Sequence, residues 1–289
     1  MKRENQAGPN PGTAPAAIRR LAISLSTLSL LLLPRPAAGQ LRPTGPVEWD
    51  IFENVRPWAF GLGVGLLEGQ RASLAGTSGD LLEGGNFRIA YRSGRIGLEF
   101  TGTLARRFRD EDILRSPAPG TDGPDGRTRH DAGDMLATTL IRLNSADSPF
   151  LVALRFGTRL PTTSNEPGLD RDRTDFFTTL AAHYRAGRYA VSAETGLAIL
   201  STRVDGIDQL DVQNFSFAIE SRVGPLTASG GIVGQDDWHR RVVRGNEDLS
   251  EIRLGLRAGD RAWVAVTAVK GIAEFSPGYG VLVMIGVRR

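Results

Sequence analysis

Residues 57–67 read PWAFGLGVGLL, and their side chains alternate strictly between two kinds. Successive side chains of a β-strand point to opposite faces of the sheet. The segment therefore predicts a strand with one strongly apolar face and one face of small residues, mostly glycine. The apolar face carries Trp58, Phe60, Leu62, Val64 and Leu66.

The same two-residue period recurs along most of the remaining chain, and no stretch shows a convincing helical period. Clear repeats occur at 95–105, where apolar residues alternate with Gly, Glu and Thr, and again at 188–200 and 278–289. The pattern predicts twelve strands in all, with the phase ambiguous in two of them (134–144 and 261–270). The strands are 57–67, 84–93, 95–106, 134–144, 149–160, 174–186, 188–200, 211–222, 225–234, 249–258, 261–270 and 278–289.

The connections between these strands alternate in length along the chain. Short ones such as Ser93-Gly94 and Ala186-Gly187 are separated by longer polar ones, of which 68–83 and 107–133 are examples. Tight turns at one end, long loops at the other and an even strand number are typical of outer-membrane β-barrels. We therefore expect a twelve-stranded antiparallel transmembrane barrel over residues 57–289, with short periplasmic turns and long extracellular loops.

Aromatic residues lie near the predicted short turns, mostly in the apolar phase of their strands. Aromatic rings favour the membrane–water interface, where an apolar body and a polar edge are both satisfied. In a soluble β-sandwich the same rings would fill a core, but that fold gives no reason for the alternating loop lengths. The expected lipid-interface aromatics are Trp58, Tyr91, Phe150, Tyr184, Tyr189 and Trp263.

The first 39 residues have the three parts of an export signal. Basic residues precede a 13-residue apolar run at 21–33, and the small residues Ala37 and Gly39 follow it. That run is shorter than the ~20 apolar residues that a transmembrane helix needs. We expect residues 1–39 to be a signal peptide cleaved near Gly39 and residues 40–56 to be a periplasmic lead-in to the barrel.

The charge balance excludes a nucleic-acid partner. Residues 1–39 contain five of the 35 basic residues and one of the 32 acidic residues, which leaves 30 and 31 for the remainder. A nearly neutral protein lacks the basic footprint that nucleic acid requires. The chain has no Cys, so a disulfide scaffold and a thiolate metal site are also excluded. We expect no cofactor or metal. The partners we expect are outer-membrane lipid, the barrel assembly machinery and an unidentified small-molecule solute.

The inward phase of the strands is polar and carries both signs of charge, as a barrel lumen should. One interpretation is a narrow passage for small molecules with a mild preference for anions. The alternative is a ladder of Arg–carboxylate pairs that closes the lumen of a structural or surface-interaction barrel, which would act through loops 107–133 and 235–248. The expected lumen-lining residues are Arg88, Arg92, Glu99, Arg142, Arg155, Arg159, Asp175, Glu194, Glu220, Arg222, Glu251 and Arg253.

Catalysis is a weaker hypothesis, and we expect no catalytic residue. A nucleophilic site would need a histidine beside a nucleophile. The three histidines, His130, His183 and His239, have no recognisable nucleophile motif nearby. A lipid-modifying barrel enzyme is therefore the less favoured alternative to passage of small molecules.

One stretch resembles a known family. Gly157, Arg159, Leu160, Pro161 and Thr162 match a Gly-x-basic-Leu-Pro-Thr pattern that ends a strand, and a Gly/Asp-rich loop and a tight hairpin follow it. This arrangement resembles the phenol-degradation-pathway outer-membrane proteins, over about residues 150–289. The resemblance implies a transporter of hydrophobic compounds.

Overall fold

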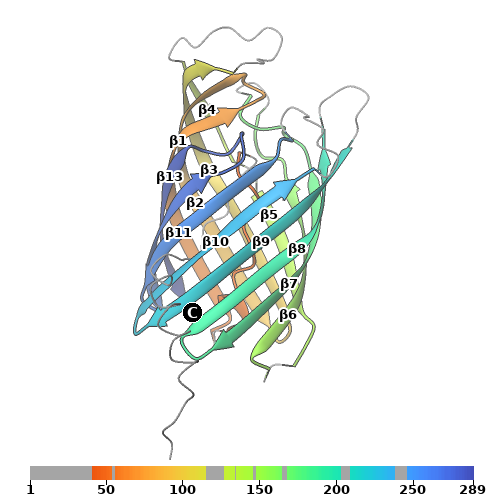
Figure 1. The fold of residues 1–289 in the computed structure, drawn as a ribbon, viewed down its shortest axis with the longest axis vertical. Helices are drawn as coiled ribbons and strands as arrows, with labels where there is room; N and C mark the ends of the chain where they lie inside the picture. Colours follow the sequence, from red (N-terminus) through yellow and green to blue (C-terminus); the bar gives the residue numbers. More distant parts are fainter. Residues whose placement is uncertain are drawn as a thin grey trace, which may run out of the picture.

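The wall of the molecule is built from antiparallel strands, which Figure 1 shows tilted around a common axis. The computed structural model describes residues 41–53, 56–114, 127–133, 135–145, 148–164, 168–202, 209–237 and 246–289. The expected signal peptide, residues 1–39, lies outside them. The strands are β1 (Trp58–Ala72), β2 (Thr77–Ser93), β3 (Ile96–Ile113), β4 (Thr128–Asp131), β5 (Met135–Arg142), β6 (Phe150–Leu160), β7 (Asp175–Ala186), β8 (Tyr189–Ser201), β9 (Gln209–Val223), β10 (Leu226–Asp236), β11 (Leu249–Ala258), β12 (Ala262–Gly271) and β13 (Tyr279–Arg288).

The sheet closes on itself. Consecutive strands pair along the chain except β4 and β5, and β1 also pairs with β13 from Ala59–Arg288 to Glu68–Tyr279. The short β4 and β5 pair with successive parts of the same edge of β3, so together they occupy one position in the wall. The result is a closed twelve-stranded barrel, as the sequence predicts, with the two ends of the barrel chain hydrogen-bonded at Trp58 and Arg289.

The outer face of the barrel is apolar and the inner face is polar. Leu62, Leu180 and Ile285 face outward, and their side chains are 52%, 52% and 60% exposed. Inner-face polar residues such as Ser229 and Glu251 are 0% exposed. A protein dissolved in water has the opposite arrangement, so the solvent around this wall is hydrocarbon. The protein is therefore an outer-membrane β-barrel, and the soluble β-sandwich is excluded.

Strands β1, β2 and β3 are longer than the sequence pattern predicts. The expected loop at 68–83 is mostly strand, since β1 and β2 extend to a short turn at residues 73–76. A β-bulge adds one residue to a strand and thereby reverses which positions beyond it face inward. The alternating sequence pattern is broken at that point, so the extension was not predicted. Gly85 is such an added residue: it has a φ of +67° and lies outside the β1–β2 register, in which Gly63 pairs with Asn86 and Val64 with Gly84.

The assignment of Trp263 to the lipid interface is wrong. In β12 the exposed positions are Ala262, Val264, Val266, Ala268 and Lys270, so Trp263 belongs to the inward phase. Its indole fits inside because two glycines of neighbouring strands lack side chains. A Cβ on Gly61 would lie 3.4 Å from the indole, and one on Gly286 would lie 2.3 Å from it. The other expected interface aromatics, Trp58, Tyr91, Phe150, Tyr184 and Tyr189, lie in the outward phase of their strands.

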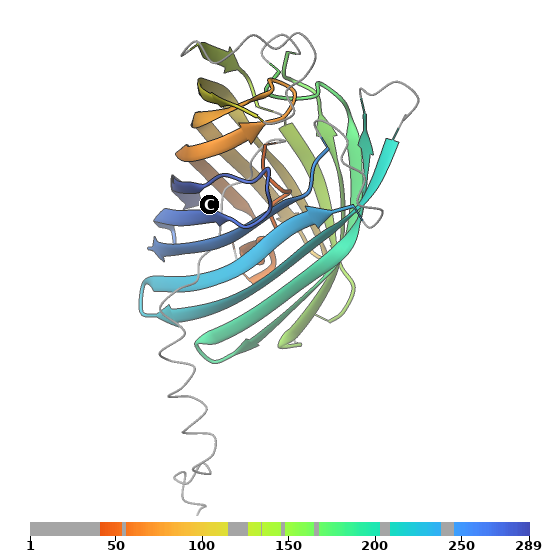
Figure 2. The same cartoon turned by 45° about the horizontal axis from the view of Figure 1, so that its top comes forward.

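Residues 41–53 lie inside the barrel rather than in the periplasm, where the sequence analysis placed residues 40–56. Figure 2 shows this segment within the ring of strands, ending in the short helix α2 (Asp50–Glu53). Trp49 is 6% exposed and Arg42 is 0% exposed. Residues 41–53 have no two-residue period, so their partners across the lumen were not predicted. No helix among the described residues is both long and apolar enough to cross a bilayer.

The outward orientation of the apolar residues makes a depth-dependent prediction. Leu180 lies in the middle of β7, and Val223 lies outward beside a tight turn. Leu180→Arg should lower the free energy of unfolding in lipid vesicles by about 2–4 kcal/mol, because a charge near the bilayer midplane is costly. Val223→Arg should lower it by only about 0–1 kcal/mol. Urea unfolding of the refolded protein measures both, and equal losses would contradict the orientation.

Candidate functional site

The structure places all twelve expected lumen residues on the inner face, at three levels. Each level is defined by its distance from the tight turns at the end where β1 begins, which we call the short-turn mouth. The level toward the opposite loop end contains Arg159, Asp175, Glu251 and Arg253. The level at intermediate depth contains Arg88, Glu99, Arg155 and Glu194. The level near the short-turn mouth contains Arg92, Arg142, Glu220 and Arg222.

Residues 41–53, which we call the plug, are held to this inner face by charges. At the loop end the Arg42 guanidinium donates two hydrogen bonds of 2.8 Å to the Glu251 carboxylate, which also accepts one of 2.7 Å from Arg253. The side chains of Arg42 and Glu251 are 0% exposed. A planar guanidinium matches a carboxylate in this two-point geometry, so the contact fixes the position of the plug as well as neutralising its charge.

In the middle of the lumen the plug binds through its backbone. The carbonyl of Gly45 accepts a hydrogen bond of 2.7 Å from Arg155, and the amide of Val47 donates one of 3.0 Å to Glu194. Arg155 and Glu194 also pair with each other at 3.0 Å. The plug pairs with none of the strands that the structure describes, so these wall side chains satisfy backbone groups that would otherwise be buried without a hydrogen bond.

At the short-turn end α2 presents two carboxylates to basic wall residues. Asp50 pairs with Arg88 at 3.0 Å and with Arg288 at 2.9 Å. Glu53 lies 2.9 Å from His183 and accepts hydrogen bonds of 2.6 and 2.7 Å from Arg185. Burial alone would raise the pKa of Glu53, but its hydrogen bonds with His183 and Arg185 lower this pKa to about 2.

Apolar contacts anchor both ends of the plug. Near the short-turn end, Trp49, Ile51 and Phe52 pack against small or aliphatic inner-face residues that include Leu140 and Ala153. The Trp49 ring also stacks on His183, with 5.1 Å between ring centroids. At the other end Leu41 joins a cluster that contains Leu67, Ala72, Ala75, Leu81, Phe108 and Leu169. Apolar burial is therefore concentrated at the two ends, while the middle of the plug is held by polar groups.

A loop also folds inward and adds charge pairs that the sequence did not predict. Asp170 accepts a hydrogen bond of 2.9 Å from Arg106, which is 3.3 Å from Glu83. Arg171 pairs with Asp175 on the neighbouring strand.

The positions of Arg42, Asp50 and Glu53 were missed for the same reason as the loop residues, since none lies on an alternating strand. One signal was present: the expected inner face has more Arg than carboxylates, so extra acids had to come from elsewhere.

The plug and these charge pairs fill the lumen at intermediate depth. Inner-face residues there are inaccessible to water, with Thr267 1%, Thr179 2% and Arg155 4% exposed. A cavity of about 370 Å³ remains at the short-turn mouth, lined in part by Phe52 and His183. Among the residues that the structure describes, the centre of the lumen is therefore closed.

The histidines do not form a catalytic arrangement within the described residues. His183 is buried between Glu53 and Trp49, and its contacts hold the plug. His130 lies exposed on β4, and His239 falls outside the described residues. No group of three or more His, Asp or Glu in the described part of the chain is placed to hold a metal ion.

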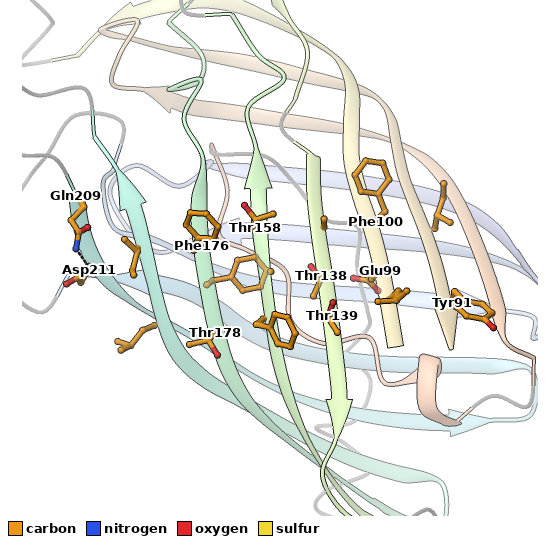
Figure 3. Close-up of a pocket in the computed structure, with 18 of the residues that line it drawn as sticks. Tyr91, Glu99, Phe100, Thr138, Thr139, Thr158, Phe176, Thr178, Gln209 and Asp211 are labelled. Carbon is orange, nitrogen blue, oxygen red and sulfur yellow. Dashed lines mark hydrogen bonds between the residues drawn. The ribbon is translucent and has the colours of Figure 1, made fainter. Parts of the chain in front are cut away.

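A second hollow, of about 1100 Å³, lies on the outer face of the wall. Figure 3 shows its lining side chains across neighbouring strands, from Tyr91 to Asp211. Its lining includes the small outward residues Ala137, Thr139 and Thr158 and larger rings such as Phe176. Most of its lining is apolar and belongs to outward positions, as expected of a surface that acyl chains cover.

Solved structures resemble this chain in fold. An outer membrane channel from Pseudomonas putida F1 has a TM-score of 0.55 at 14% identity, and the match covers 81% of this chain and 95% of that chain. For outer membrane phospholipase A from Escherichia coli the TM-score is 0.46 at 12% identity, with 84% and 99% covered. For a toluene transporter from Ralstonia pickettii it is 0.41 at 12% identity, with 90% and 96% covered.

The sequence matches no protein-family model and no curated protein sequence. The resemblance to the phenol-degradation-pathway proteins therefore stays a prediction. At 14% identity the likeness to the Pseudomonas channel concerns the fold, which is that of an outer-membrane β-barrel.

Proposed function

We propose that the protein is an outer-membrane channel for small molecules and that the plug closes it in the state described here. Passage then requires residues 41–53 to leave the lumen, wholly or in part. The observation that carries this proposal is that polar contacts hold the middle of the plug and contribute at both of its ends. Charge pairs join Arg42 to Glu251 and Glu53 to Arg185, and the plug backbone hydrogen-bonds to Arg155 and Glu194.

The energetics of these contacts favour a removable plug. Burying charges costs hydration, and their mutual attraction repays that cost only in part. When the plug leaves, water can reach the freed Arg and carboxylate groups, so the loss is partly offset. A plug packed along its whole length against an apolar wall would have no such compensation. A polar inner wall also suits a water-filled passage, which the same barrel would offer once open.

The alternative is a permanently closed barrel whose loops act at the cell surface. The complete burial of Arg42 and Glu251 is the observation that favours it, because separating a buried ion pair leaves two charges without their partners and is strongly destabilising. The two functions differ in one respect that can be measured, namely whether the plug leaves the lumen.

A reversible lock on the plug tests the channel directly. The chain has no Cys, so an introduced pair has no competing thiol. A Cβ on Gly97 would lie 3.4 Å from Cγ1 of Ile51, which is within reach of a disulfide between plug and wall. In planar bilayers the Ile51→Cys/Gly97→Cys protein should show no openings when oxidised, and openings like those of the wild type when reduced.

Two outcomes would count against the proposal. Equal conductance of the oxidised and reduced protein would show that solutes pass without moving the plug. Silence of the wild type, of the reduced double variant and of a variant lacking residues 41–53 would show that the barrel does not conduct and would favour the closed alternative. Cold-detergent gel migration, which separates folded from boiled barrels, verifies that each protein is folded.

The lowered pKa of Glu53 makes a pH prediction. A carboxylate whose pKa falls from 4.5 when free to about 2 when bound stabilises the bound plug fully above pH 4.5, and this contribution is lost as the pH falls toward 2. At pH 7, Glu53→Gln should therefore open roughly tenfold more often than the wild type, since a charged hydrogen bond is lost. This difference should shrink between pH 4.5 and 2. Single-channel recording across pH measures it, and a difference that persists at pH 2 would contradict the role of Glu53.

A further inference from the structure

The cavity at the short-turn mouth is lined by more basic than acidic side chains. It has a volume of about 370 Å³, and Arg142, Arg185, Arg222 and His183 lie on its lining together with Glu53. Glu53 is engaged by His183 and Arg185, and Glu220 lies 3.6 Å from Arg185. The two carboxylates that face the cluster are thus paired with Arg185, while Arg142 and Arg222 are not paired with either.

Of the two arginines without a carboxylate partner, Arg142 is the buried one. It is 9% exposed, and its Nε is buried without a hydrogen-bond partner. Its guanidinium makes no hydrogen bond or ion pair with any residue that the structure describes, and it lies 5.9 Å from the centroid of the Phe52 ring. The Phe52 ring compensates the charge of this guanidinium only in part, and a buried N–H group without a hydrogen-bond partner is costly.

Arg222 completes the arrangement from the exposed side. It belongs to the inward phase of β9 and lies at the mouth, where its side chain is exposed. Within the described part of the chain its guanidinium has no carboxylate partner. The cavity therefore has one basic group in its wall and one at its entrance, and no carboxylate of the described residues pairs with either.

We propose that this cavity is a binding site for a small oxyanion, a carboxylate or phosphate group, held between Arg142 and Arg222. Guanidinium groups recognise both anions through paired hydrogen bonds. The volume lies within the range of small-ligand pockets, roughly 300–1,000 Å³. The site faces the short-turn side of the membrane. Its existence does not depend on conduction through the lumen, so it stands or falls separately from the proposed channel.

Calorimetric titration of the folded full-length protein in detergent tests the site. Inorganic phosphate and acetate are titrated separately at low ionic strength, with chloride as the reference ion, which distinguishes the two oxyanion classes. The wild type should bind at least one of them saturably at one site. Arg142→Gln and Arg222→Gln should each weaken binding roughly tenfold, because each removes a charged hydrogen-bonding group.

Arg261→Gln is the matched control, since it removes the same charge from an exposed turn at the same end of the barrel, outside the cavity lining. Its affinity should equal that of the wild type. Arg222 lies at the surface, so its variant keeps the test valid if Arg142→Gln does not fold. Absence of saturable binding of both anions to the wild type would overturn the site. Equal loss in the Arg261 variant would also overturn it, because the effect would then be one of net charge.

Discussion

Every backbone amide and carbonyl that crosses a bilayer must find a hydrogen-bond partner within the protein, because hydrocarbon offers none. This constraint requires the sheet to close, and the β1–β13 ladder is where it closes. Closure fixes the rest of the structure. One face of each strand must be apolar for lipid, and the other face encloses a lumen that the remaining residues have to fill or leave open.

The contents of the lumen follow from the charge on its wall. Charged side chains that are buried on the inner wall need partners of opposite charge. The plug supplies such partners through Arg42, Asp50 and Glu53. Wall side chains also hydrogen-bond the plug backbone, through Arg155 and Glu194, where a neighbouring strand would do so in a sheet. Charge pairs give positional specificity, and they leave the segment less tightly committed to the interior than an apolar core would.

The wall was largely predictable because a two-residue period is a local property of the chain. Twelve strand positions, the outward apolar set and the inward charged set all follow from it. Prediction failed where the period breaks or is ambiguous. Bulges such as the one at Gly85 reversed the inward and outward phase of the pattern, so that part of a strand was predicted to be a loop. Trp263 lay in a strand whose phase was ambiguous. The plug could not be predicted, because its contacts join residues up to 238 positions apart, as between Asp50 and Arg288.

The claim on which the account depends is that the plug lies inside a wall whose outer face touches lipid. Lipids with brominated acyl chains quench only tryptophans that they contact, so they distinguish the two faces. In variants with a single tryptophan, Trp58, which is 41% exposed on the outer face, should be strongly quenched. Trp49, which is 6% exposed in the plug, should keep its fluorescence. Quenching of Trp49 to the same extent as Trp58 would contradict the account.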